Sequence, residues 1–420
     1  MSFQQGLSGL NATAQNLQII GNNIANAGTF GSKVARAEFA DVFAAAGGGS
    51  SDTAIGIGTT LSTVAQQFTQ GNITTTENPM DLAINGAGFF QLTDPSGSVS
   101  YTRNGQFKVD RDGFIVSNGG LRLMGYGVDG QGVVQPGGAG ALRLPTSGLS
   151  PSPTTKVTIE MNLDARQATT LPAVAPQIDY DDAATYNNAT SVTVFDAKGQ
   201  EVSLTYYFQK AGNDTWNVYA TANGNSVGGV AGAPLPVSSL VFAADGSAPT
   251  APLGPVTFDI PASANTQGAE TMAITGLMFD LGSATQFGSP FGVTDLRQDG
   301  YSAGQLAAIG IEDNGVVTAR YTNGRTRPAG QVELATFRNP QGLRAAGDNA
   351  WVQTYASGDP VSGVPGEGAL GMLQAGALEE SNVDLTGELV NMITAQRTYQ
   401  ANAQTIKTQD QVLQTLLNLR

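Results

Sequence analysis

Residues 1–32 read MSFQQGLSGLNATAQNLQIIGNNIANAGTFGS and contain no charged side chain. Apolar or small residues recur here with alternating spacings of four and three, at Phe3, Leu7, Leu10, Ala14, Leu17, Gly21, Ile24 and Gly28. This spacing predicts an α-helix with the narrow apolar stripe of a coiled coil. Many of the other positions are Asn or Gln, whose amides can hydrogen-bond inside an assembly without the desolvation penalty of a charge.

The last forty residues carry a similar pattern. One heptad position holds Leu385, Met392, Tyr399, Ile406 and Leu413, and the other holds Leu389, Gln396, Ala403, Asp410 and Leu417. Ser381 and Asp384 precede this run in the arrangement of a capping box. The pattern predicts a second helix, in which the polar Gln396 and Asp410 would fix the register of a coiled coil.

Two interpretations of these helices are open. They could be surface helices packed on a globular core, but such helices normally have a charged outer face, which residues 1–32 lack. We therefore predict a terminal coiled coil that is buried mainly between subunits. We call its large apolar residues the terminal seam: Phe3, Leu7, Leu10, Leu17, Ile24, Leu385, Leu389, Met392, Tyr399, Ile406, Leu413 and Leu417.

The sequence between the two ends predicts strands and turns. Hairpin turn signals such as Asn104-Gly105 and Asp112-Gly113 separate short apolar runs. Val202, Leu204, Tyr206 and Phe208 alternate with polar residues, as in a strand that buries one face. The expected fold is mainly β with α-helical termini. Its expected parts are a coiled coil (1–28 with 378–420), a connecting region (29–70), a discontinuous β domain (71–145 with 290–377) and an inserted outer β domain (146–289).

Composition excludes several classes of function. The 420-residue chain has a net charge of −14, which argues against binding nucleic acid or an anionic membrane. It has no His and no Cys, so His-based catalysis, thiol nucleophiles and disulfides are excluded. The first basic residue is Lys33, so we expect no cleaved signal peptide. The sequence also lacks an apolar run long enough to span a membrane.

Motifs that resemble chemical sites have simpler explanations. Residues 125–130 match the glycine spacing of a dinucleotide-binding loop, but the sequence that follows predicts no helix to hold a phosphate. The acidic pair Glu379 and Glu380 is expected to be solvated at the surface. We therefore predict no catalytic, metal-binding or cofactor-binding residue, no cofactor, and a protein that is not an enzyme.

Several motifs resemble the rod-and-hook family of bacterial flagellar axial proteins. The resemblance covers roughly the first 130 and the last 120 residues and is most specific near the C-terminus. The matching positions include Asn22, Asn23, Ile24, Ala25, Asn26, Ser381, Asn382, Val383, Asp384, Gln396, Arg397, Tyr399, Gln400, Ala401 and Asn402. One departure is Thr29-Phe30-Gly31-Ser32-Lys33, where the family usually shows Thr-Gly-Phe-Lys. The long insertion after Pro145 is similar to that of hook proteins.

The resemblance implies a structural subunit that polymerises with itself into a curved, flexible tube, which joins the rod to the filament and transmits torque. It also implies contacts with the distal rod protein, the hook cap protein, the hook–filament junction protein and the flagellar type III export apparatus. We expect the protein neither to bind nucleic acid nor to insert into a membrane. The expected location is the extracellular flagellum, attached to the basal body, reached without a cleaved signal peptide.

Two other functions are open from the sequence. A distal rod-type subunit belongs to the same family and would form straight assemblies rather than curved ones. A secreted, β-rich glycan-binding protein is favoured by the acidic, Thr- and Ser-rich middle of the chain, but it would give the terminal seam no role.

Overall fold

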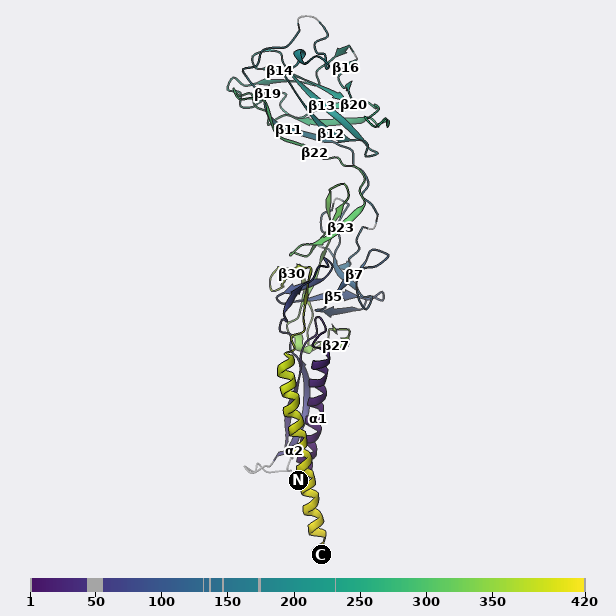
Figure 1. Ribbon diagram of the computed structural model, residues 1–420, viewed down its shortest axis with the longest axis vertical. Helices are drawn as coiled ribbons and strands as arrows, with labels where there is room; N and C mark the ends of the chain where they lie inside the picture. Colours follow the sequence, from purple (N-terminus) through teal and green to yellow (C-terminus); the bar gives the residue numbers. More distant parts are fainter. Residues whose placement is uncertain are drawn as a thin grey trace. The chain divides into compact units, whose positions relative to one another are not determined.

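The chain forms two compact units. A computed structural model describes residues 2–43, 56–130, 132–135, 137–145, 147–172, 175–230 and 232–418, without the side chains of Ser2, Phe43 and residues 416–418. Unit 1 comprises residues 1–146, 307–320 and 326–420, and unit 2 comprises residues 147–306 and 321–325. Strands dominate both units and a helix lies near each end of the chain (Figure 1), which confirms the expected mainly β fold with α-helical termini.

Unit 1 contains both long helices, α1 (Ser2–Asn26) and α2 (Leu385–Asn418), which lie side by side (Figure 1). Its strands before unit 2 are β1 (Ala35–Phe43), β2 (Gly56–Gln66), β3 (Ile73–Thr75), β4 (Leu82–Asn85), β5 (Phe89–Thr93), β6 (Val99–Thr102), β7 (Phe107–Val109), β8 (Ile115–Ser117), β9 (Arg122–Tyr126) and β10 (Gly140–Ala141). Its later strands are β23 (Leu306–Ile311), β24 (Val316–Tyr321), β25 (Thr326–Val332), β26 (Leu334–Thr336), β27 (Arg344–Gly347), β28 (Ala350–Val352), β29 (Val361–Gly363), β30 (Met372–Ala375) and β31 (Ala377–Glu379), with a 3-10 turn at Pro340–Gly342.

The strands of unit 1 join distant parts of the sequence. β5 pairs with β6 and β9 on the N-terminal side of the chain and with β26 on the C-terminal side. Aromatic rings pack edge to face beneath this sheet, with ring centroids 5.8 Å apart for Phe89 and Trp351 and 4.7 Å apart for Tyr101 and Phe337. This edge-to-face packing stabilises the crossing of the two chain segments beyond the area that the rings bury.

The second helix begins later than the sequence predicts. Residues 377–379 form β31, which pairs with β3, and α2 starts at Leu385. Asp384 caps this helix, because its Oδ1 accepts a hydrogen bond from the backbone N–H of Thr386 at 3.0 Å. Ser381 instead accepts from Val383 outside the helix, so the expected capping box is not formed.

The expected connecting region contains a long strand pair. β1 and β2 run antiparallel from the Ala35–Gln66 pair to the Phe43–Gly56 pair and pack along α1. Thr, Val and Ile are frequent in β2, and these β-branched residues favour extended backbone. The glycine tract near residue 48 lies outside the described residues.

Unit 2 is a β-sandwich. One sheet has the order β20-β21-β11-β22, and the other has the order β12-β13-β14-β18-β19 with β15 attached to β14. Its strands are β11 (Lys156–Asn162), β12 (Asn188–Phe195), β13 (Glu201–Lys210), β14 (Thr215–Ala222), β15 (Asn225–Ser226), β16 (Gly229–Val230), β17 (Ala233–Pro234), β18 (Ser238–Phe242), β19 (Pro249–Ala251), β20 (Val256–Ile260), β21 (Ile274–Asp280) and β22 (Gly292–Gln298), with a 3-10 turn at Ala183–Thr185.

The core of unit 2 lies between the two sheets. Val202, Leu204, Tyr206 and Phe208 on β13 are fully buried, which confirms the predicted alternation. Tyr206 stacks in parallel on Phe279 of the facing sheet, with ring centroids 4.1 Å apart. Such contacts fix the distance between the sheets at the thickness of interdigitated side chains.

We expect Phe279→Ala to destabilise unit 2 by about 3–5 kcal/mol, because it removes the stacked ring and leaves a cavity. Each unit holds one of the two tryptophans of the chain, Trp351 in unit 1 and Trp216 in unit 2. Urea unfolding followed by Trp216 fluorescence, in a Trp351→Phe background, measures the loss. Trp351 fluorescence, in a Trp216→Phe background, should give an unchanged midpoint. A shift of both midpoints together would contradict the division into two units.

Candidate functional site

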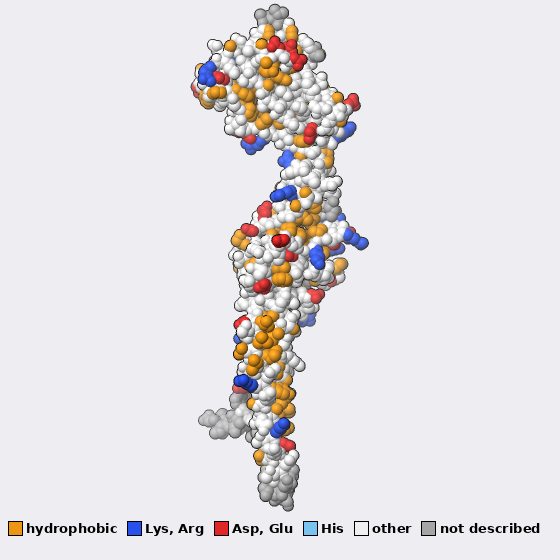
Figure 2. All heavy atoms as spheres, in the orientation of Figure 1, with side chains coloured by type: hydrophobic (Ala, Val, Ile, Leu, Met, Phe, Trp, Pro, Cys, Tyr) orange, Lys and Arg blue, Asp and Glu red, His pale blue; other side chains and the backbone are white. Residues whose placement is uncertain are grey.

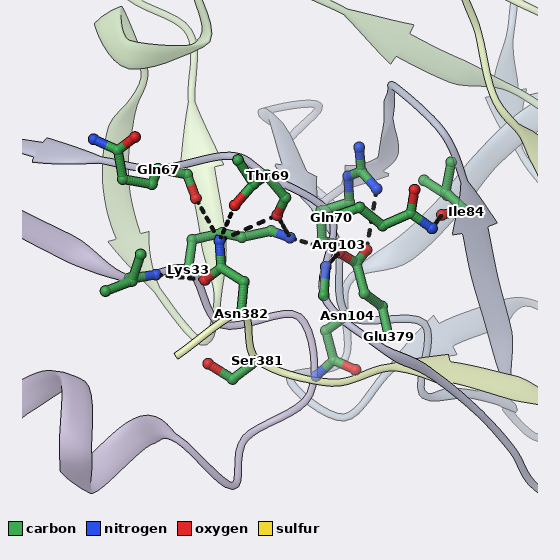
Figure 3. A network of polar contacts seen from close by, with 12 residues as sticks. Lys33, Gln67, Thr69, Gln70, Ile84, Arg103, Asn104, Glu379, Ser381 and Asn382 are labelled. Atoms are coloured by element: carbon green, nitrogen blue, oxygen red, sulfur yellow. Dashed lines mark hydrogen bonds and ion pairs between the residues drawn. The ribbon is translucent and has the colours of Figure 1, made fainter. Parts of the chain in front are cut away.

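A buried carboxylate joins three distant segments of unit 1. Glu379 at the end of β31 accepts a hydrogen bond from Lys33 Nζ at 2.6 Å and another from Arg103 Nη1 at 3.0 Å (Figure 3). The three side chains are almost completely buried. Glu379 Oε1 also accepts from the backbone N–H of Gly71 at 2.8 Å. The expectation that Glu379 is solvated was wrong, because two cations and a backbone amide replace its water.

This charge cluster carries two positive groups and one negative group. Burial lowers the pKa of Lys33 and outweighs the opposing effect of Glu379 beside it. Burial likewise lowers the pKa of the Arg103 guanidinium. Backbone carbonyls stabilise both cations, since Lys33 donates to Thr69 O and Arg103 donates to Gly86 O, each at 2.8 Å.

Two asparagines of the family motif imitate peptide groups beside this cluster. Asn23 of α1 accepts from the N–H of Ala35 at 2.9 Å and donates to its carbonyl at 2.8 Å. Asn382 accepts from the N–H of Val34 and donates to Gln67 O, both at 2.8 Å. The two amides therefore fasten the base of the β1–β2 pair to α1 on one side and to the start of α2 on the other.

The turn between α1 and β1 requires Gly31. Its φ is +71°, and its N–H donates to the carbonyl of Glu379 at 2.8 Å. A Cβ atom at this position would lie 2.5 Å from the backbone nitrogen of Asn104. Glycine is the residue that accepts both the left-handed backbone and this close approach. The departure from the family motif in this segment thus places a glycine at the tightest point of the turn.

The two helices meet where small residues of α1 face α2, and one member of the terminal seam, Ile406, takes part in this contact. A Cβ on Gly6 would lie 3.1 Å from Ile406 Cγ1, and a Cβ on Gly9 would lie 2.9 Å from Asn402 Nδ2. The backbones of α1 and α2 therefore approach closely in this region. The sequence pattern identified the helices, but a spacing of apolar residues does not reveal that glycines form the contact.

Half of the terminal seam is exposed in the single chain. The exposed members are Phe3, Leu7, Leu385, Leu389, Tyr399 and Leu413, with 37–49% of their surface accessible. Leu10, Leu17, Ile24, Met392 and Ile406 are partly buried, and the side chain of Leu417 lies outside the described residues. The role of these residues between subunits stays a prediction.

The motif residues divide between internal contacts and the surface. Asn23, Asn382 and Asn402 contact other segments of unit 1. Ile24, Asn26, Ser381 and Val383 are half-buried. The exposed members are Asn22, Ala25, Asp384, Gln396, Arg397, Tyr399, Gln400 and Ala401.

Further apolar side chains cover the outside of the helical region. Val390 and Ile393 on α2 are more than half exposed, and Phe39, Val42 and Val64 of the strand pair are also exposed. Figure 2 shows apolar side chains gathered over the part of unit 1 that holds the helices. Exposed apolar surfaces of this kind are typical of sites at which a protein binds another molecule.

A groove of 850 Å³ opens between α1, β1 and α2. Its walls include Ala12, Asn16, Ile20, Val34, Glu388 and Ala395, and we call it the terminal groove. The site therefore combines a groove with neighbouring apolar ridges. In helix–helix packing, the ridges of one helix fit into the grooves of another.

A metal site and a membrane-spanning helix are both absent from the part of the chain that the structure describes. They contain no group of three or more His, Cys, Asp or Glu side chains placed to hold a metal ion. Gly125 and Tyr126 end β9, and the next described element after the glycine-rich segment is the strand β10, not a helix. Among the described helices, none is long and apolar enough to cross a membrane.

Four family models match the chain. They are described as flagella basal body rod protein (residues 3–33), flagellar hook protein FlgE/F/G D1 domain (83–199), flagellar basal body protein FlaE D2 domain (162–301) and flagellar basal body rod FlgEFG protein C-terminal (374–419).

Full-length relatives carry a consistent description. The chain is 42% identical to the flagellar hook protein FlgE of Escherichia coli and 40% identical to that of Salmonella typhimurium, in each case over the whole of both chains. The solved structure of the flagellar hook protein FlgE2 of Helicobacter pylori superposes with a TM-score of 0.52 at 16% identity. It covers 73% of this chain and 99% of that one, and supports the fold alone.

We expect Glu379→Gln to destabilise unit 1 by about 3–5 kcal/mol, because it leaves two buried cations without their counter-charge. Lys33→Met should cost less, about 1–2 kcal/mol, since Arg103 and Glu379 then remain a neutral pair. Thr69 O would also keep its hydrogen bond from Asn382. Urea unfolding monitored by Trp351 measures both variants. Equal losses would show that the net charge of the cluster is unimportant.

Proposed function

Because the chain belongs to the flagellar hook protein family, we propose that the exposed terminal seam and the terminal groove are the surfaces through which its subunits join. The protein is a structural subunit of the bacterial flagellar hook. Family membership implies that it polymerises with itself. Our proposal goes further in two respects. It names the surfaces through which subunits join, and it assigns the protein no enzymatic activity.

The observation that carries this proposal is the incomplete burial of two helices that already contact each other. α1 and α2 pack through Gly6 and Gly9, yet Leu7, Leu385 and Leu389 remain about half exposed. Full burial of one such side chain contributes about 1.5–3 kcal/mol. Because each subunit exposes several of these side chains, covering them with neighbouring copies would contribute favourably to the free energy of association.

The same surfaces suit an open helical assembly. The terminal groove and the ridge that the exposed Val390 and Ile393 form on α2 are different surfaces of one subunit, so contact between them is head to tail. Head-to-tail contacts that do not close into a ring produce a helical polymer. We propose that this polymer is the curved tube that joins the rod to the filament. Charged residues make up 13% of the chain, so few ion pairs would have to break when subunits slide past one another during bending.

A head-to-tail polymer has two unlike ends, and we propose different partners for them. One end would meet the distal rod protein. The other would meet the hook cap protein during growth and the hook–filament junction protein afterwards. We further propose that subunits reach an extracellular hook through the flagellar type III export apparatus. The absence of Cys supports this, because no disulfide would need reduction before an unfolded chain passes through a channel.

We expect Val390→Asp to prevent tube formation at concentrations at which the unchanged protein forms curved tubes. A carboxylate in an apolar contact between subunits would be desolvated without a partner. Negative-stain microscopy and pelleting measure assembly, and Trp351 fluorescence checks that unit 1 remains folded. Leu253→Asp is the matched control, since Leu253 is 94% exposed but belongs to unit 2. Normal tubes from Val390→Asp would refute the assignment of this surface.

A further inference from the structure

The terminal groove contains a carboxylate that its own chain does not neutralise. Glu388 lies in the first turn of α2 and lines the groove. Its Oε2 atom is buried and has no hydrogen-bond partner among the described residues. The positive end of the α2 dipole explains why an acidic residue is tolerated in this turn. It does not supply the directed donor that a buried carboxylate oxygen requires.

The cation that lines the same groove is engaged elsewhere. Arg36 lines the same groove but pairs with Glu38 at 3.1 Å. On α2, Arg397 and Lys407 are exposed and form no ion pair within the described part of the chain. One subunit therefore displays an unneutralised carboxylate in a groove and unneutralised cations on its surface.

Helix geometry places Arg397 opposite Glu388. The two residues are nine positions apart on α2. At about 100° and 1.5 Å per residue, they point in opposite directions and lie roughly 13 Å apart along the axis. Arg397 therefore points away from Glu388 of its own chain and is not among the residues that line the groove. Val390 and Ile393 share its face of the helix, and both are more than half exposed.

We propose that Arg397 of one subunit enters the terminal groove of a second copy of this chain and pairs with Glu388 there. Val390 and Ile393 of the first subunit then cover the apolar wall that Ile20 and Val34 provide. This inference rests on the proposed function and names the partner of the groove. A guanidinium suits the role, because its planar fork can donate two parallel hydrogen bonds to one carboxylate.

Lys407 is the less suitable cation. It lies about 100° around the helix from Glu388 and about 21 Å beyond Ile393 along the axis, so it is displaced from the ridge of Val390 and Ile393 toward the C-terminus. Its ammonium is also a compact, strongly hydrated charge without the planar fork. It therefore provides a control of equal charge on the same helix.

Charge reversal with purified full-length protein tests the pairing. Glu388→Lys gives a subunit with a positive groove and a positive ridge, and Arg397→Glu gives one with a negative groove and a negative ridge. We expect each variant alone to pellet at least tenfold less polymer than the unchanged protein. An equimolar mixture should recover tubes, because each groove then meets a ridge of opposite charge. Lys407→Glu should assemble within twofold of the unchanged protein.

The outcomes separate the pairing from the proposed function. Normal tubes from Arg397→Glu alone would overturn the pairing, and this variant removes no contact within the single chain. A mixture that assembles no better than its components would also overturn it. In both cases tubes from the unchanged protein leave the proposed function intact. If the unchanged protein forms no tubes in any condition, the proposed function fails and the pairing fails with it.

Discussion

The burial of Glu379 between Lys33 and Arg103 is the interaction on which unit 1 depends. It brings together the segment after α1, the strand region near residue 100 and the segment before α2. Asn23 and Asn382 add peptide-like hydrogen bonds around it. Both long helices have an end near it in the sequence, since α1 ends seven residues before Lys33 and α2 begins six residues after Glu379.

The helices α1 and α2 are anchored at the charge cluster, which explains why apolar side chains on their outer surfaces can stay exposed in the single chain. The charge cluster and the close contact at Gly6 and Gly9 hold α1 and α2 together while half of the terminal seam stays exposed. Those side chains remain available to neighbouring copies. Under the proposed function, the contacts that hold the monomer together are therefore separate from those that join it to the polymer.

The sequence predicted the elements better than their contacts. The heptad spacing identified both helices, and the alternation on β13 identified a buried strand face, because each pattern reflects local geometry. Glu379 was expected at the surface, since no local pattern shows that residues 33 and 103 meet residue 379. The contact at Gly6 and Gly9 was missed for the same reason. One local feature could have pointed to the buried cluster: Lys33 is the first charged residue after a long uncharged stretch.

The position of Glu379 late in the chain sets an order for folding during synthesis. Lys33 and Arg103 leave the ribosome first, but their shared counter-ion follows some 280 residues later. Unit 1 therefore cannot close until translation is nearly over, which delays the moment at which its two apolar helices are held side by side.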